Sequence, residues 1–177
     1  MSIKVIGIDP GLAATGIGIL MGDRNKVTAY AYGTITTTPH EHQGARLEKI
    51  YARLCSLFAE EDPDLLVIED VFSLDRYPKS GISLGKVCGV ILLASQQAHV
   101  AIKEIPVREA KQVLTGNGNA GKGQLEKAVR LSIGCPDPIR PYHASDALGL
   151  ALIGLFRYGG TRAEKCDSYV QKCKLSE

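Results

Sequence analysis

The sequence lacks several features that would indicate a function directly. Its five cysteines include no C-x-x-C pair, and several lie in apolar patterns, which favours reduced thiols over a disulfide framework. No apolar run reaches the length of a transmembrane helix, and no signal peptide precedes the first strand, so we expect a cytoplasmic protein without a membrane partner. The net charge of +2 neither indicates nor excludes nucleic acid, because basic residues can be concentrated on one face.

The composition is that of an ordinary globular protein. The 177 residues are 45% hydrophobic and 23% charged, which is enough for one domain with a substantial core. No internal repeat and no low-complexity linker divides the chain. We expect one domain over residues 1–158, followed by a polar C-terminal tail over 159–177 whose two cysteines, Cys166 and Cys173, have no predicted pairing.

Hydrophobic periodicity predicts alternating blocks of strands and helices. The expected strands lie within 3–9, 11–22, 26–38, 64–71 and 100–105, and the expected helices at 41–61, 81–99, 107–114, 122–133 and 143–158. The two expected exposed loops are 72–82 and 115–123, which are rich in turn-forming residues. Three successive strands suggest an antiparallel meander, and the later alternation of helix and strand suggests parallel strands. The order therefore predicts an α/β fold with a mixed sheet.

Acidic residues interrupt two of the apolar strands. Asp9 closes the first strand in "VIGIDPG", and Glu69 lies near the end of "LLVIEDV". A buried carboxylate is costly unless it is paired or coordinated, so Asp9 indicates a solvated strand end, a salt bridge or a metal ligand. Asp146, in "YHASDALGLAL", follows His143 by three residues, a spacing that puts both side chains on one helix face near an expected helix start.

These four residues together suggest a metal site. Three acids gathered without a basic partner would repel one another, and a divalent cation removes that repulsion. Oxygen ligands suit Mg²⁺ or Mn²⁺, and one imidazole excludes neither ion. Two such ions about 3.5–4 Å apart can activate a water and stabilise the leaving oxygen of a phosphodiester. Each residue alone also has a structural interpretation, as a turn, cap or strand-end residue.

Four segments resemble, in order, the motifs of the RuvC family of Holliday junction resolvases. They are "GIDPGLAATGIGI", "VIEDVF", "GNGNAGKGQLEKAV" and "HASDALGLAL", and the resemblance extends from about residue 3 to about residue 157. It implies an RNase H-like fold, with a five-stranded sheet flanked by helices on both faces. It also implies a homodimer that nicks two symmetry-related strands of a four-way DNA junction with Mg²⁺, in recombination and repair, and that cooperates with the RuvA–RuvB branch-migration motor.

The resemblance assigns roles to particular residues. It makes Asp9, Glu69 and Asp146 the metal-binding carboxylates, with Asp9 shared by two Mg²⁺ ions and His143 in a fourth position that is Asp in some family members. Mn²⁺ is expected to substitute. A neutral imidazole brings one negative charge fewer, which would alter metal preference without abolishing activity. The attacking water would be deprotonated at the metal, so no nucleophilic side chain is required.

The resemblance also implies DNA contacts. Phe72 matches an aromatic that stacks on a base at the opened junction, although from the sequence alone a core residue at the end of a strand is the better interpretation of Phe72. Lys111 and Lys122 match lysines near the scissile backbone, and the loop before Lys122 could bring backbone N–H groups to phosphate. The remaining candidate DNA contacts are Arg76, Lys79 and Lys86. The segment 81–99 is apolar around most of its circumference, so it could form part of a two-fold dimer interface or be an intramolecular core helix.

Three other functions remain open from the sequence. A nuclease of the YqgF type shares the G-x-D-x-G opening and acts on RNA. A phosphate-binding domain of the actin and sugar-kinase class would use "GIDPGLAATG" for nucleotide, but those enzymes need two such domains. A non-catalytic junction-binding module is the third alternative. "GNGNAGKG" is not a P-loop, because Gly123 stands where Ser or Thr would follow Lys122.

Overall fold

The computed structural model describes the backbone of residues 1–70 and 78–159, and the side chains of residues 1–70 and 81–159. The strands are β1 (Ile3–Asp9), β2 (Ala14–Gly22), β3 (Val27–Thr36), β4 (Leu65–Glu69) and β5 (Ile102–Ile105). The helices are α1 (Gln43–Glu61), α2 (Pro78–Gln97), α3 (Val107–Thr115), α4 (Lys122–Ile133) and α5 (Tyr142–Tyr158). None of the helices in this described part is both long and apolar enough to cross a membrane.

The five strands form one mixed sheet in the order β3-β2-β1-β4-β5. β1, β2 and β3 pair antiparallel, whereas β1–β4 and β4–β5 are parallel pairs. The helix that follows β4 crosses over the sheet before β5, as a parallel pair requires. The prediction of an α/β fold with a mixed five-stranded sheet is confirmed.

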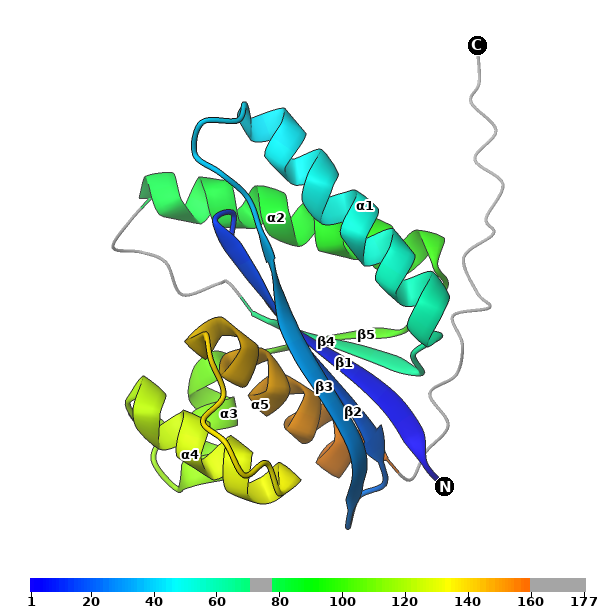
Figure 1. The fold of residues 1–177 in the computed structure, drawn as a ribbon, viewed down its shortest axis with the longest axis vertical. Coiled ribbons are helices and arrows are strands. Elements are labelled where there is room, and N and C mark those ends of the chain that lie inside the picture. Colours follow the sequence, from blue (N-terminus) through cyan, green and yellow to red (C-terminus); the bar gives the residue numbers. More distant parts are fainter. Residues whose placement is uncertain (71–77, 160–177) are drawn as a thin grey trace.

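Helices cover both faces of the sheet (Figure 1). One layer consists of α1 and α2, and the other contains α3, α4 and α5. Successive residues of β1 serve the two layers in turn, because side chains alternate across a strand. Ile6 and Ile8 pack in the apolar cluster with α1 and α2, whereas Val5 packs in the cluster that includes α5. The central strands β1 and β4 are therefore buried on both sides, which explains their nearly continuous apolar sequences, whereas most residues of the edge strand β3 are exposed or half-buried.

Two glycines allow α5 to lie directly against the sheet. A Cβ on Gly7 of β1 would lie 2.0 Å from the carbonyl oxygen of Ala147, and a Cβ on Gly16 of β2 would lie 2.0 Å from that of His143. No side chain fits in either gap. The close approach matters for function, because the first turns of α5 carry His143 and Asp146.

The element bounds differ from the sequence-based prediction at two informative places. Residues 78–82 were expected in a loop but are the start of α2. Proline suits the first position of a helix, since it has no N–H to satisfy there and its φ is already helical, which explains a start at Pro78. In α5, Asp146 was expected in the first turn, but the helix begins at Tyr142, so Asp146 lies in the second turn.

Candidate metal and DNA-cleavage site

The sheet brings the first two predicted ligands to adjacent strand ends. β1 and β4 are parallel, and their register pairs Val5 with Leu65 and continues to Ile8 with Ile68. Asp9 and Glu69 are the next residues of the two strands, so their carboxylates leave the sheet at the same edge. The two strand ends therefore lie side by side.

The helix α5 brings the other two predicted ligands to the same place. His143 Nδ1 lies 2.6 Å from Asp9 Oδ2, although the two residues are 134 positions apart. Asp9 is buried, at 7% exposure, whereas the side chain of His143 is 42% exposed. Gly16 pairs with Asp9 across β1 and β2, and it is also the glycine against which the backbone of His143 packs. The contact between Asp9 and His143 therefore depends on the absence of a side chain at position 16.

The electrostatics show that the carboxylates share one site. Burial, then the charge of Asp9 and a hydrogen bond with it, and then the charge of Asp146 raise the pKa of Glu69 from 4.5 to about 7. Burial and then the charge of Asp9 raise the pKa of Asp146 from 3.8 to about 6. Raised carboxyl pKa values in a cluster of acids are typical of functional sites, because such a cluster is costly without a cation.

The residues present fit a divalent cation by their chemistry. Asp146 Oδ1 is buried and has no hydrogen-bond partner among the described residues. A buried carboxylate oxygen without a hydrogen-bond partner, beside Asp9 and Glu69, is available as a ligand, and hard cations prefer oxygen ligands. Within residues 1–70 and 81–159, however, no three His, Cys, Asp or Glu side chains are already gathered closely enough to enclose an ion. Binding would thus require side-chain rotation at the site.

Two of the predicted DNA-contacting lysines lie near these acids. The charge of Lys111, in α3, opposes the rise in the pKa of both Glu69 and Asp146. The charge of Lys122, the first residue of α4, opposes the rise in the pKa of Asp146. Both lysines come from the α3–α5 layer and supply positive charge next to the carboxylates, where a scissile phosphate would have to approach.

Lys86 is the one other predicted DNA contact whose side chain the structure describes, and it does not join this group. Lys86 is exposed on α2, where its Nζ donates a hydrogen bond of 2.8 Å to Gln43 Oε1 of α1, and no described contact links it with the four candidate ligands. Phe72 and Arg76 lie outside the described residues. For Lys79 the structure describes the backbone but not the side chain. Their roles stay predictions.

Several residues that shape the site were not singled out from the sequence. Gly7 and Gly16 had a possible signal, since they face the small residues of the HASDAL segment, but this pairing is visible only once strands and helix are in register. Glu126 in α4 gave no signal, because it reads as one charge on an amphipathic helix.

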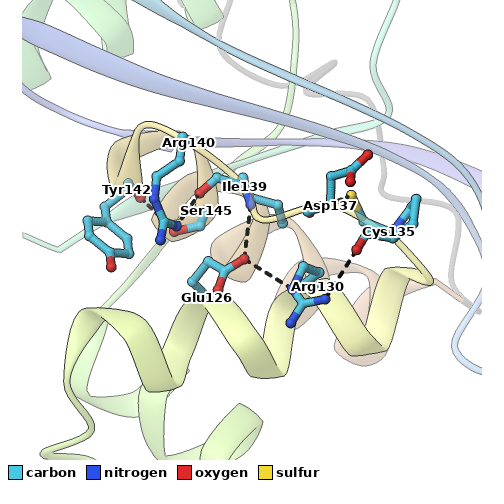
Figure 2. Close-up of polar contacts among 9 residues, drawn as sticks. Glu126, Arg130, Cys135, Asp137, Ile139, Arg140, Tyr142 and Ser145 are labelled. Carbon is cyan, nitrogen blue, oxygen red and sulfur yellow. Dashed lines mark hydrogen bonds and ion pairs between the residues drawn. The ribbon is translucent and has the colours of Figure 1, made fainter.

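Figure 2 shows what Glu126 does. It is 6% exposed, and its Oε1 accepts a hydrogen bond of 2.9 Å from the Ile139 N–H and lies 3.3 Å from Arg130 Nε. Arg130 in turn donates to the Pro136 carbonyl, at 3.4 Å. The buried Glu126 and the half-buried Arg130 together hold the connection 134–141, which leads directly into α5.

Comparisons with known proteins agree with the fold and the motifs. A sequence profile of the family described as crossover junction endodeoxyribonuclease RuvC matches residues 5–154. The RuvC of Treponema denticola is 39% identical over 161 residues, covering 90% of each chain. That of Carboxydothermus hydrogenoformans is 35% identical over 158 residues, covering 89% of this chain and 99% of its own. The structure of Thermus thermophilus RuvC in complex with a Holliday junction substrate superposes with a TM-score of 0.81 at 29% identity, covering 87% of this chain and 93% of that one.

Proposed function

The chain belongs to the RuvC family of crossover junction endodeoxyribonucleases, and from this membership we propose that it resolves four-way DNA junctions by paired nicks. The chain is accordingly a hydrolytic nuclease of DNA recombination and repair. The observation that carries the proposal is the convergence of Asp9, Glu69, His143 and Asp146, from two strands and a helix, in a chain that matches this family over most of its length.

The nucleases of this family need divalent metal ions, and we assign the ligands here to Asp9, Glu69, His143 and Asp146. Two Mg²⁺ ions would supply an activated water and stabilise the leaving oxygen, and Mn²⁺ would substitute. The buried Asp9 is the ligand best placed to serve both ions, because it faces His143 on one side and raises the pKa of both other acids. The imidazole of His143 adds one nitrogen ligand to three carboxylates, which favours cations that accept nitrogen as well as oxygen ligands.

The chain's own cations would bind and orient the DNA. Lys111 and Lys122 supply charge at the acids, so we assign them to the phosphates that flank the cleaved bond. Phe72 follows β4 by three residues and would stack on a base at the opened junction centre. Arg76, Lys79 and Lys86 remain further candidates for contacts with the junction arms.

We propose a homodimer formed through α2. Ile82 and Leu93 are 63% and 52% exposed, and Gly85 and Gly89 between them have open space around their Cα atoms. The spacing 82, 85, 89 and 93 places all four on one stripe of the helix, opposite the side that packs on the sheet through Val87 and Ile91. A two-fold axis along this stripe would present two equivalent sites to a junction with two equivalent strands.

We also propose that the enzyme acts in the cytoplasm alongside a RuvA–RuvB branch-migration complex. The three described cysteines (Cys55, Cys88 and Cys135) are free thiols, as expected in a reducing compartment. Cooperation with the motor follows from the proposed function alone, since branch migration moves the junction to the sequence that is cut.

The proposed function is tested by nicking of a synthetic four-way junction with and without Mg²⁺. We expect two symmetrical nicks that require the metal, and little cleavage of linear duplex. An RNA–DNA hybrid and a structured RNA of the same length serve as competing substrates. Cleavage of RNA in preference to the junction would instead favour the YqgF-type alternative, and junction binding without cleavage would favour a non-catalytic module.

A further inference from the structure

Arg140 and Tyr142 form a stacked pair immediately before α5. The guanidinium carbon of Arg140 lies 4.3 Å from the centroid of the Tyr142 ring, which is close enough for cation–π attraction. Arg140 Nη1 also donates a hydrogen bond of 2.8 Å to the Ile139 carbonyl. Figure 2 shows both side chains at the same end of the connection that enters the helix. The ring and the carbonyl thus fix the guanidinium at two points.

The backbone beneath this pair is held in place as well. The buried carboxylate of Glu126 accepts from the Ile139 N–H, one residue before Arg140. Ser145 Oγ donates a hydrogen bond of 2.8 Å to the Tyr142 carbonyl, which closes the first turn of α5. A guanidinium held in this way loses less conformational entropy on binding a ligand than a free surface arginine does.

The pair borders the candidate cleavage site. Tyr142 directly precedes His143. It also lies four residues before Asp146, so the side chains of Tyr142 and Asp146 share one face of α5. A Cβ on Gly123 would lie 3.9 Å from the Tyr142 hydroxyl oxygen, which places that hydroxyl next to the Lys122–Gly123 start of α4. The Arg140–Tyr142 pair therefore lies beside Lys122, whose charge acts on Asp146.

Arg140 is free to bind an anion. It is exposed, and none of the ion pairs among the described residues includes it. A guanidinium has five N–H donors, and among the described residues Arg140 makes one hydrogen bond to protein, to the Ile139 carbonyl. Its planar fork matches the two free oxygens of a phosphodiester, so a phosphate can be bound through two parallel hydrogen bonds.

We propose that Arg140, stacked on Tyr142, is a phosphate-binding subsite that holds the DNA backbone next to the cleaved phosphodiester. The inference rests on the proposed function, since it supplies a contact for the same substrate. It adds a fixed arginine to the flexible lysines at positions 111 and 122. Its contribution is to position the strand, and no proton or bond change passes through Arg140.

The test compares Arg140→Gln, Arg140→Lys, Tyr142→Ala and the double variant Arg140→Gln/Tyr142→Ala with the unchanged protein. Junction affinity is measured without divalent cations over a range of salt concentrations, so binding is read independently of cleavage. Arg53→Gln, an exposed arginine of α1 in the opposite layer, is the matched control for loss of one positive charge. Thermal unfolding of each variant is recorded in parallel.

We expect Arg140→Gln to weaken junction binding about tenfold and to lower the slope of log K against log salt by about one, since one phosphate contact is lost. Arg140→Lys keeps the charge but loses the fork, so it should bind with intermediate affinity. Tyr142→Ala should weaken binding less than Arg140→Gln, and the double variant should be no weaker than Arg140→Gln alone, because the ring acts through the guanidinium. Arg53→Gln should match the unchanged protein.

The outcomes separate this inference from the function on which it rests. If the unchanged protein binds and nicks the junction while Arg140→Gln keeps its affinity and salt slope, the subsite is wrong and the proposed function stands. Weaker binding with an unchanged slope and a lower melting temperature would show a structural role and would also overturn the subsite. If the unchanged protein neither binds nor nicks a junction, the proposed function fails and the subsite fails with it.

Discussion

Asp9 is the residue on which the chemistry of the site depends most. It is the most buried of the four candidate ligands, it contacts His143 directly, and its charge contributes to the raised pKa of both Glu69 and Asp146. Removing its negative charge therefore changes every other member of the group, whereas the fold around it consists of apolar strand contacts that an amide would leave intact.

We expect Asp9→Asn to reduce junction cleavage more than about 100-fold, because loss of even an outer partner of a metal ligand costs about 10–100-fold. Junction affinity should change little, because the proposed DNA contacts at the site are the side chains of Lys111 and Lys122 and not that of Asp9. Nicking rate and affinity are measured on the same junction, with Glu48→Gln, an exposed acid of α1, as the control. A near-normal nicking rate in Mg²⁺ would remove Asp9 from the metal site.

The raised pKa values of Glu69 and Asp146 predict how the stability of the metal-free protein depends on pH. Each group has a pKa in the folded chain above its value in the unfolded chain, from 4.5 to about 7 for Glu69 and from 3.8 to about 6 for Asp146. The folded state therefore binds more protons, so the stabilisation is complete below about pH 4 and is lost as the pH rises through about 6 to 7.

We thus expect the melting temperature of the metal-free protein to fall between pH 5 and pH 8. Glu69→Gln removes one of the two raised pKa values and should flatten this dependence. Calorimetry on the two proteins in the same metal-free buffers measures the difference. Identical pH profiles for the variant and the unchanged protein would show that Glu69 titrates as an ordinary exposed acid.

At the scale of elements, the contact between α5 and the sheet decides whether the site forms. Gly16→Ala places a methyl group 2.0 Å from the His143 carbonyl oxygen, which forces α5 away from Asp9. We expect a loss of about 1–3 kcal/mol in the free energy of unfolding, as in other overpacked cores, and a marked fall in nicking rate.

Gly33→Ala on β3 is the matched control for this change. Nothing lies within 4 Å of the Cβ position at Gly33, so the same substitution should cost little there. Chemical denaturation and the nicking assay are run on both variants. Equal stability and equal activity of the two variants would contradict the close-approach argument.

The sequence predicted the elements well because their patterns are local. Within residues 1–70 and 78–159, alternation and apolar runs located the five strands and the helical period located the five helices, because each pattern reports which side of one element is buried. The strand ends at Asp9 and Glu69 could be predicted for the same reason, because an acid that interrupts an apolar run is visible in one segment.

What the sequence did not predict depends on contacts between segments. The fit of Gly16 against His143 requires the register of two strands and the position of a helix. Glu126 reads as a solvated charge until the fold buries it against the Ile139 N–H, 13 residues further along the chain. These features come from long-range packing, which local propensity does not encode.

At the scale of the whole molecule, the candidate cleavage site and the proposed dimer interface lie on different helical layers. The α3–α5 layer carries the candidate ligands on α5, together with Lys111 and Lys122, whereas the α1–α2 layer presents the exposed apolar stripe of α2. The sheet separates the two layers (Figure 1). Dimer formation and cleavage chemistry can therefore be disturbed separately.

Leu93→Glu puts a charge on the exposed apolar stripe of the proposed α2 interface, and we expect it to convert a dimer into a monomer. Sedimentation measures the mass, and the junction assay should show single nicks in place of paired nicks. Leu131→Glu, on the 66% exposed Leu131 of α4, is the control for an added charge on an exposed leucine. A dimer that survives Leu93→Glu but is lost in Leu131→Glu would move the interface to the other layer.

The most direct test of the account is a crystal structure of the protein grown with Mn²⁺, in which the anomalous signal locates each ion. The account predicts Mn²⁺ bound by the carboxylates of Asp9, Glu69 and Asp146 and the imidazole of His143, and no such signal there in Asp9→Asn. Mn²⁺ bound only at other residues, in a protein that still cleaves junctions with Mn²⁺, would contradict it.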